Sequence, residues 1–538
     1  MPAEPRDLAD IPRPRPHRSL SFYFVLFFLV LPFWSVTPLS CAFLLHALTS
    51  PFTWPTRALF VIALLEVSFG IYCYCLTSRI SNPNSFSHSD LLEIQIAFKR
   101  LLKTGLASLP DDGGDEESLD ILRPASPDES ITQLEPNDPR AIDFRNSLRT
   151  WFRGATWSSI RLREMHQWLY WSIYNAEMPD TLSHAQRLVL NDALNHLQKR
   201  TGTEILEGSN PQSQPMRLTI DPVKIHWRPL TYYILLTILN RFLRGWFTTR
   251  YKAMYDFYDG IEYLIRIPND WNPSSELRPI IFIHGLGLGL MQYNIFLRHF
   301  FTHFTDRPLL VLLQPQISQD FFHPRFLTPL NRQQTVQRLV KLLDKLGWVH
   351  LDRKWKSPKN TTKSEQESGR LTGTQSTGVT ILSHSNGSYT HAWILKDYSM
   401  IVTRSCFVDP VTFCSWEGDV CYNFLYRSCT TGTELLMHYF VGSELGVANL
   451  LHRHFDWASN SLWFEEIPNA RDPSKTLFFL GGKDSIVNSE RVKKYLSSHG
   501  VKKGLRYDPE GRHGQALMAG GHGHTMILQW LKDSSITT

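Results

Sequence analysis

The first apolar stretch of the chain is long and without charge. From Ser19 to Thr56 there is no acidic residue, lysine or arginine, and the run from Phe22 to Leu48 exceeds the roughly 20 apolar residues that cross a bilayer. A second run, Ala58 to Leu76, has spanning length but contains Glu66, which costs a few kcal/mol at mid-bilayer unless it is protonated or paired. The pattern predicts a transmembrane hairpin over residues 19–78, of one or two spans. A cleaved signal peptide would have a shorter apolar region.

A helical pattern follows after a polar interval. Residues 141–260 are expected to form a helical extension, because between Ala141 and about Arg200 tryptophans and aliphatic residues recur at helical spacing. Its tryptophan-rich face needs burial, which favours packing on the rest of the protein. Within it, Leu230 to Leu239 is apolar and leads into a basic, aromatic stretch ending near Lys252. This segment is either a core helix or a helix lying in a membrane interface.

From Ile261 onward, short β-branched runs alternate with amphipathic helices. Strands are predicted at Tyr263–Ile267, Pro279–Ile283, Leu309–Leu313, Val379–Leu382, Cys406–Val408, Leu477–Leu480 and Lys503–Tyr507. Strand and helix in alternation indicate an α/β domain over 261–538, with a doubly wound, mainly parallel sheet. Residues 352–378 are expected to be a polar surface insertion, and about 411–470 a helical cap.

The remaining segments are polar. Residues 1–18 form a basic tail, and 79–140 are predicted to be a linker, acidic and disordered from about residue 104. Basic residues precede the first apolar run and follow the second, so the positive-inside rule places both ends of the hairpin and the α/β domain in the cytosol. The expected partner is therefore a lipid bilayer, although the sequence does not say which membrane.

The overall charge excludes one class of partner. The net charge of +6 is spread along the chain rather than concentrated in a basic block, so nucleic-acid binding is not expected. The seven cysteines have neither a CxxC pair nor metal-ligand spacing. No metal and no cofactor is predicted.

The candidate nucleophile is Ser385, in Ser383-His384-Ser385-Asn386-Gly387 after a β-branched run. A serine is exposed for attack by a sharp turn from strand to helix, which needs small residues two positions before and two after it. Gly387 supplies one, whereas Ser383 replaces the usual first glycine. Upstream, His284-Gly285-Leu286-Gly287 follows another apolar run and can present backbone N–H groups to an oxyanion. The predicted donors are Leu286 or Gly287, together with Asn386.

The acid and the base each have more than one candidate. Asp484, in a Gly-Gly-Lys-Asp loop after an apolar strand, is the favoured acid, and Asp409 is its rival. The favoured base is His513, 29 residues later (513 − 484) in the loop that leaves the final strand. His522 and His524 remain alternatives.

The ordered motifs around Leu286, Ser385 and Asp484 resemble the α/β-hydrolase superfamily, in its membrane-anchored esterase and lipase-like branch. The resemblance covers about Tyr263 to Leu531. It implies an acyl-enzyme route with Ser385 attacking, His513 as base and then acid, and Asp484 orienting His513. The expected substrate is a hydrophobic carboxylic ester or an acyl lipid.

Two alternatives stay open at this point. The first is an inactive membrane scaffold, because Ser383 departs from the usual pattern and the base is ambiguous. The second is an acyltransferase on the same fold, because fold does not fix function.

Overall fold

The computed structural model describes residues 17–49, 54–81, 90–105, 131, 133–350 and 377–533. Most of the predicted basic tail, most of the acidic stretch after about residue 104 and nearly all of the predicted insertion lie outside these residues.

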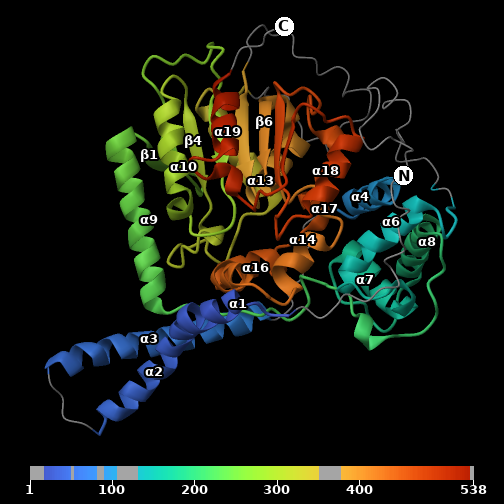
Figure 1. Ribbon diagram of the computed structural model, residues 1–538, viewed down its shortest axis with the longest axis horizontal. Coiled ribbons are helices and arrows are strands. Elements are labelled where there is room, and N and C mark those ends of the chain that lie inside the picture. The colour runs from blue at the N-terminus through green and yellow to red at the C-terminus, as the bar shows by residue number, and fades with distance from the viewer. Residues whose placement is uncertain are drawn as a thin grey trace.

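The core is one sheet of eight strands in the order β1-β2-β4-β3-β5-β6-β7-β8 (Figure 1). β2 pairs antiparallel with both β1 and β4, and all the other pairs are parallel. The predicted α/β architecture with a mainly parallel sheet is confirmed. The strands are β1 (Met254–Tyr258), β2 (Ile261–Arg266), β3 (Ile280–Ile283), β4 (Leu309–Leu313), β5 (Val379–His384), β6 (Val402–Val408), β7 (Thr476–Gly481) and β8 (Leu505–Asp508).

The sheet begins one strand earlier than the sequence pattern indicates. β1 belongs to the segment predicted to be helical, and it lies at the sheet edge with most of its residues exposed. Helix α9 (Leu230–Tyr251) ends in the left-handed residue Lys252, and only Ala253 then separates it from β1. With so short a connection, no loop signal marks the change from helix to strand.

Helices cover both faces of the sheet, because alternate residues of the central strands point to opposite sides. Ile281, Ile381 and Phe407 face one layer, whereas Phe282, Leu382 and Cys406 face the other. The first layer contains α11 (Arg332–Lys345), α13 (Gly387–Tyr398) and α18 (Ser489–Ser498), and the second contains α9, α10 (Leu290–His303) and α19 (His522–Lys532).

Between β6 and β7 the chain forms the predicted helical cap. The apolar side chains of the cap make three kinds of contact. Trp457 and Trp463 pack into the main core, and Leu450 and Phe455 line a cavity. Tyr439 packs against the N-terminal helices. The cap comprises α14 (Asp419–Cys421), the π-helices η9 (Tyr422–Tyr426) and η10 (His438–Gly442), α15 (Gly432–Met437), α16 (Leu445–Arg453), α17 (Trp457–Asn460) and η11 (Phe464–Glu466).

The helical extension packs on this cap. It is built from α6 (Pro139–Leu148), α7 (Leu162–Tyr174) and α8 (His184–Thr201). The Trp151 indole donates to the carbonyl of Trp416 at 2.8 Å, and the Trp457 indole donates to the carbonyl of Ser172 at 2.9 Å. The tryptophans are thus buried against the α/β half of the chain, as their spacing predicts.

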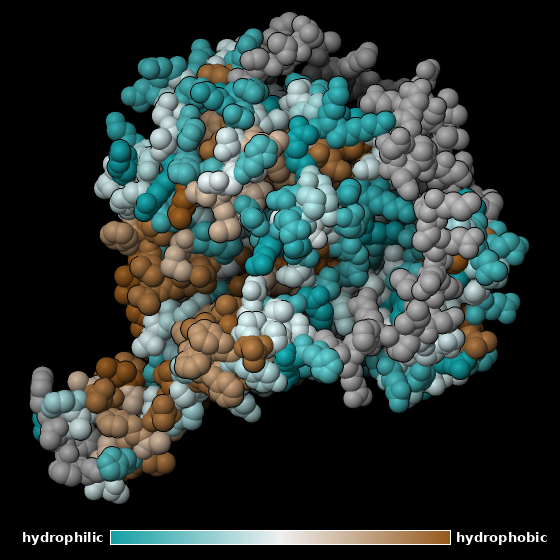
Figure 2. All heavy atoms as spheres, in the orientation of Figure 1, coloured by the Kyte–Doolittle hydropathy of each residue, from teal (hydrophilic) through white to brown (hydrophobic). Residues whose placement is uncertain are grey.

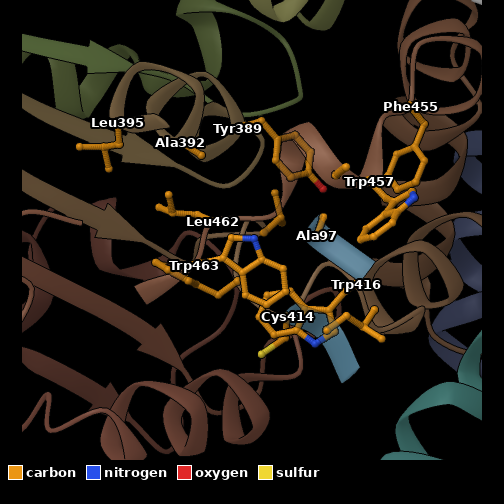
Figure 3. Close-up of a cluster of buried hydrophobic side chains, with 14 of the residues drawn as sticks. Ala97, Tyr389, Ala392, Leu395, Cys414, Trp416, Phe455, Trp457, Leu462 and Trp463 are labelled. Carbon is orange, nitrogen blue, oxygen red and sulfur yellow. The ribbon is translucent and has the colours of Figure 1, made fainter. Parts of the chain in front are cut away.

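Part of the predicted linker is instead a packed helix. α4 (Leu91–Lys103) is amphipathic and buries Ala97, Leu101 and Leu102 in the main core. Figure 3 shows Ala97 in the same cluster as Trp457 and Trp463 of the cap. The expectation of a linker fails here because the segment's apolar residues recur at helical spacing and its surroundings bury that face.

The N-terminal apolar segments form two helices long and apolar enough to cross a membrane by length and composition, Leu20–Ala47 and Pro55–Ser81. The first consists of α1 (Leu20–Val25), the π-helix η2 (Leu26–Val30) and α2 (Leu31–Ala47), and the second is α3 (Trp54–Ser81). Val25 and Phe33 pack against the cap at Tyr439 and Phe440. Figure 1 shows the cap between these helices and the sheet.

Glu66, the one charged residue inside the second apolar run, has partners. It is 2 % exposed, and its carboxylate accepts the N–H of Leu230 at 2.8 Å and the N–H of Thr231 at 3.2 Å. These groups are at the start of α9, where backbone N–H groups lack partners within the helix and the helix dipole favours a negative charge. The cost of Glu66 in an apolar helix is therefore offset by capping α9.

Candidate active site

Ser385 lies in a tight turn between β5 and α13. Its φ of +50° is in the left-handed region, which strains a serine. The turn is closed by the Ser385 N–H, which donates to the carbonyl of Val408 at 3.0 Å. Gly387 is required because a Cβ at that position would overlap the carbonyl oxygen of Ile283. The sharp strand-to-helix turn that the sequence predicts at Ser385 is present.

Ser383, which departs from the usual glycine, has a role of its own in the turn. It is fully buried, and its Oγ lies 2.9 Å from His391 Nδ1 on α13. His391 Nε2 in turn lies 3.1 Å from Ser405 Oγ on β6. Burial lowers the pKa of His391 to about 3, so the ring is neutral. Ser383 thus joins β5 to α13, the helix that follows Ser385.

The predicted base and acid meet the serine. His513 Nε2 lies 2.8 Å from Ser385 Oγ, and His513 Nδ1 lies 2.6 Å from Asp484 Oδ2. The other carboxylate oxygen of Asp484 accepts the N–H groups of Ile486 at 2.7 Å and Val487 at 3.0 Å. A loop after β7 therefore holds Asp484 in place, and the loop after β8 brings His513 to it.

Asp409, the rival acid, lies behind the same histidine but does not hydrogen-bond to it among the described contacts. Its carboxylate accepts the N–H of Gly481 at 2.9 Å and the N–H of Gly514 at 2.7 Å. It therefore ties the end of β7 to the residue that follows His513. Burial raises the pKa of Asp409 to about 6, against the opposing charge of His513.

The electrostatics of this group favour a charged imidazole. Burial alone would lower the pKa of His513, but the charge of Asp484, its hydrogen bond and the charge of Asp409 outweigh that effect and raise the pKa to about 9. The same two carboxylates would stabilise the imidazolium that forms when a histidine takes a proton from a serine.

The two alternative bases, His522 and His524, do not contact Ser385 among the described residues. His522 is exposed at the first position of α19. His524 is buried, with Nε2 2.9 Å from His299 Nδ1 and Nδ1 3.2 Å from the carbonyl oxygen of Leu517. Within the described residues, only His513 among the three contacts Ser385.

The predicted oxyanion donors separate into two groups. The N–H of Gly287 already donates to the carbonyl of Ile317 at 3.0 Å, so the prediction of Gly287 as a donor is not supported. By contrast, the N–H groups of Leu286 and Asn386 have no acceptor among the described residues. Asn386 directly follows Ser385. Leu286 follows Gly285, whose backbone is so close to the turn that an added Cβ would lie 2.8 Å from the Cβ of Ser385. Both N–H groups are therefore near Ser385.

Two residues that hold the glycine-rich loop were missed by the sequence analysis. Gln319 is fully buried and donates to the carbonyl of Gly287 at 3.1 Å, while its own oxygen accepts the Tyr232 hydroxyl at 2.8 Å. Asn240 donates to the carbonyl of Leu288 at 3.2 Å. Tyr232 and Asn240 belong to α9. Nothing in the sequence near these residues signals the role, because they meet the loop only in the folded chain.

The arrangement can be compared with known proteins. No protein-family model matches the sequence, and no curated protein does. Among solved structures, a bacterial membrane phospholipase A is 13 % identical, with a TM-score of 0.31 over 57 % of this chain and 94 % of that one. An α/β hydrolase from a Medee basin deep-sea metagenome is 14 % identical, with a TM-score of 0.34 over 53 % of this chain and 99 % of that one. An esterase of Pyrococcus furiosus is 11 % identical, with a TM-score of 0.30 over 53 % of this chain and 94 % of that one.

The strand order and the turn after β5 decide the fold. The chain has the α/β-hydrolase fold. In this fold the serine, acid and histidine follow one another along the chain, which is the order of Ser385, Asp484 and His513.

Beside the hydrolase turn there is a small cavity of about 80 Å³. Asn386, which follows Ser385, and Tyr389 of α13 line it on one side, and Leu450 of α16 and Phe455, two residues after α16, line it from the cap. The cap therefore contributes apolar side chains to a cavity that is also lined by Asn386, the residue after Ser385.

The two aspartates and the histidine near Ser385 also have the side-chain types of a metal site. Donor atoms of Asp409, Asp484 and His513 lie within 4.8 Å of one another. However, both nitrogens of His513 face Ser385 and Asp484, and both oxygens of Asp409 accept backbone N–H groups. The ligand atoms are thus already engaged, which fits a proton-transfer group better than a metal centre.

Proposed function

We propose that this protein is a membrane-associated serine hydrolase that cleaves a hydrophobic carboxylic ester or acyl lipid. The observation that carries the proposal is the hydrogen-bonded series Ser385, His513, Asp484, with distances of 2.8 Å and 2.6 Å between successive side chains. A serine next to an oriented imidazole is the arrangement that activates a hydroxyl for acyl transfer.

In the first half of the reaction, Ser385 Oγ attacks the ester carbonyl and His513 takes the hydroxyl proton. The N–H groups of Leu286 and Asn386 stabilise the resulting oxyanion. When the intermediate collapses, His513 gives that proton to the leaving alcohol and an acyl-Ser385 remains. In the second half, a water gives its proton to His513 and attacks the acyl carbon, which releases the acid and returns the proton to Ser385.

The preference for a hydrophobic substrate rests on the surroundings of the serine. Leu450 and Phe455 line the cavity that Asn386 also lines, and the cap lies between the sheet and the apolar N-terminal helices. An acyl chain would find apolar side chains there, and a lipid would reach the site from the side of the anchor.

Replacing Ser385 tests the proposal directly. Ser385→Ala is expected to abolish labelling by a fluorophosphonate probe and the hydrolysis of esters, with an unchanged unfolding temperature, because only the nucleophile is lost. As a control, Ser498→Ala on α18 removes a hydroxyl that donates to the carbonyl of Tyr495, and this variant should still be labelled by the probe. Absence of labelling in the parent protein would instead support an inactive scaffold.

The substrate class needs a second measurement. Purified protein in vesicles should release fatty acid from acyl lipids and should hydrolyse long-chain esters faster than acetyl esters. A strict preference for acetyl esters would overturn the assignment of the apolar cavity as an acyl-binding region.

We also propose that both ends of the N-terminal hairpin and the catalytic domain are cytosolic, supported by the basic residues that flank the apolar runs. A glycosylation tag after Thr538 should stay unmodified in cells, and protease added outside sealed microsomes should digest the catalytic domain. A glycosylated tag would reverse the orientation.

A further inference from the structure

The outer face of α9 is exposed and apolar. Leu235 and Ile238 are each 57 % exposed and Phe242 is 66 % exposed, and Ile234 and Leu239 belong to the same face. The opposite face is anchored by the buried residues Leu236, Leu243 and Phe247. A contiguous apolar surface of this kind marks a contact with a partner or a membrane.

The charged residues of α9 are all in its second half, and all of them are arginines. From Leu230 to Asn240 the helix has no charged residue, and beyond it are Arg241, Arg244 and Arg250. The Arg244 guanidinium lies 3.6 Å from the carboxylates of both Glu262 and Asp320. The arginines available to headgroups are therefore the exposed Arg241 and Arg250. No acidic residue occurs anywhere in the helix. Arginines on an apolar helix suit the anionic headgroups of a membrane, whereas a protein partner of the same face would not need this one-sided charge.

The face is continuous with the N-terminal hairpin. Glu66 of α3 caps the first turn of α9, and the Phe33 ring of α2 lies 5.8 Å from the Tyr232 ring of α9. Figure 2 shows hydrophobic surface on the hairpin and, further along the same edge of the molecule, over α9. A membrane that surrounds the hairpin would therefore also contact the exposed face of α9.

The reach of the hairpin beyond α9 is limited. Glu66 marks the level of α9, and Trp54 begins α3 12 residues before it (66 − 54). At 1.5 Å per residue this is about 18 Å, compared with about 30 Å for the hydrocarbon core of a bilayer. With α9 at a membrane surface, the hairpin enters about one leaflet instead of crossing both.

We propose that α9 is a lipid-contacting helix that lies in the interface of the leaflet entered by the hairpin, so that the catalytic domain rests on the bilayer along this edge. This inference rests on the membrane association in the proposed function but not on its chemistry. Both chain ends then remain on one side of the membrane, in agreement with the proposed orientation.

Photolabelling of the full-length protein tests this placement. Ser385→Ala protein, which cannot consume the probe, is reconstituted in vesicles of phosphatidylcholine and the anionic phosphatidylserine that also contain a phosphatidylcholine with a diazirine on one acyl chain. Adducts mapped by mass spectrometry are expected on Leu235, Ile238 and Phe242, and the yield should be highest when the diazirine is close to the ester. Leu188 and Leu206, which are equally exposed but belong to the helical extension, should stay unlabelled.

A matched pair of variants sharpens the result. Ile238→Asn should reduce labelling of α9 several-fold, whereas Leu188→Asn should leave it unchanged. Labelling of the hairpin without labelling of α9 would overturn the inference. So would labelling of Leu188 at the same yield as α9, or a yield on α9 that is highest when the diazirine is at the end of the acyl chain. If neither the hairpin nor α9 is labelled, membrane association itself is wrong, while the serine chemistry is tested separately by the fluorophosphonate probe.

Discussion

The N–H of Gly514 donates to Asp409 Oδ2 at 2.7 Å, one residue after the histidine that contacts Ser385. Two carboxylates thus act on His513, Asp484 by direct contact and Asp409 through the backbone and by its charge. Asp409 is a positioning residue in this scheme.

Replacement of Asp409 by asparagine is expected to shift the pH dependence of catalysis. The negative charge of Asp409 helps to raise the pKa of His513, so its removal lowers that pKa and the free base becomes available at lower pH. The rising limb of kcat/KM against pH should therefore move to lower pH in Asp409→Asn. Asp484→Asn, the matched control, should lose several orders of magnitude in kcat because the ring loses its orientation. An unchanged limb in Asp409→Asn would contradict the assignment.

The three candidate histidines should differ sharply when replaced. His513→Ala removes the proton acceptor of Ser385 and should lower kcat by several orders of magnitude. His522→Ala should keep most activity because the side chain is exposed and away from Ser385. His524→Ala should also keep most activity but should lower the unfolding temperature, since a buried ring is lost. Loss of turnover in His522→Ala with normal turnover in His513→Ala would move the role of base to His522.

Gln319 is expected to influence rate more than binding. Gln319→Ala removes the support of Gly287, so the adjoining Leu286 N–H is displaced from the oxyanion, and kcat should fall by about tenfold to a hundredfold with little change in KM. Tyr232→Phe, which removes only the hydroxyl bonded to Gln319, should have a smaller effect in the same direction. A change confined to KM would indicate a role in substrate binding instead.

Ser383 should matter for stability and not for chemistry. Ser383→Ala leaves His391 Nδ1 without a partner in a buried position, which should cost about 1–3 kcal/mol in the free energy of unfolding. The rate of fluorophosphonate labelling per folded molecule should remain close to that of the parent. Denaturation in detergent measures the first quantity, and a large loss of labelling at full folding would show that Ser383 affects the nucleophile itself.

The central strands and the nucleophile turn are predictable because their signals are local. β3 to β7 are buried β-branched or apolar runs, and the turn at Ser385 needs Gly387. β1 is not predictable in this way, because an exposed edge strand has no buried face to give it a period of two.

The site residues divide in the same manner. Asp409 and Asp484 both follow parallel strands and end near one histidine, so only the distances distinguish the contacting acid from the positioning one. Gln319 and Asn240 reach the glycine-rich loop from distant parts of the chain. Their roles depend on tertiary contacts that no sequence period encodes.

The bond between Glu66 and the start of α9 has a consequence for biogenesis. The carboxylate and the N–H of Leu230 are 164 positions apart, so Glu66 leaves the ribosome long before its partners exist. The hairpin cannot reach its final, capped state until the extension and α9 have been made, which couples completion of the hairpin to folding of the hydrolase domain. A protein shortened to begin after Ser81 would lack the cap of α9 and would uncover Tyr439 and Phe440. Such a protein is expected to aggregate, so the N-terminal hairpin is part of the folded unit and cannot be removed without cost.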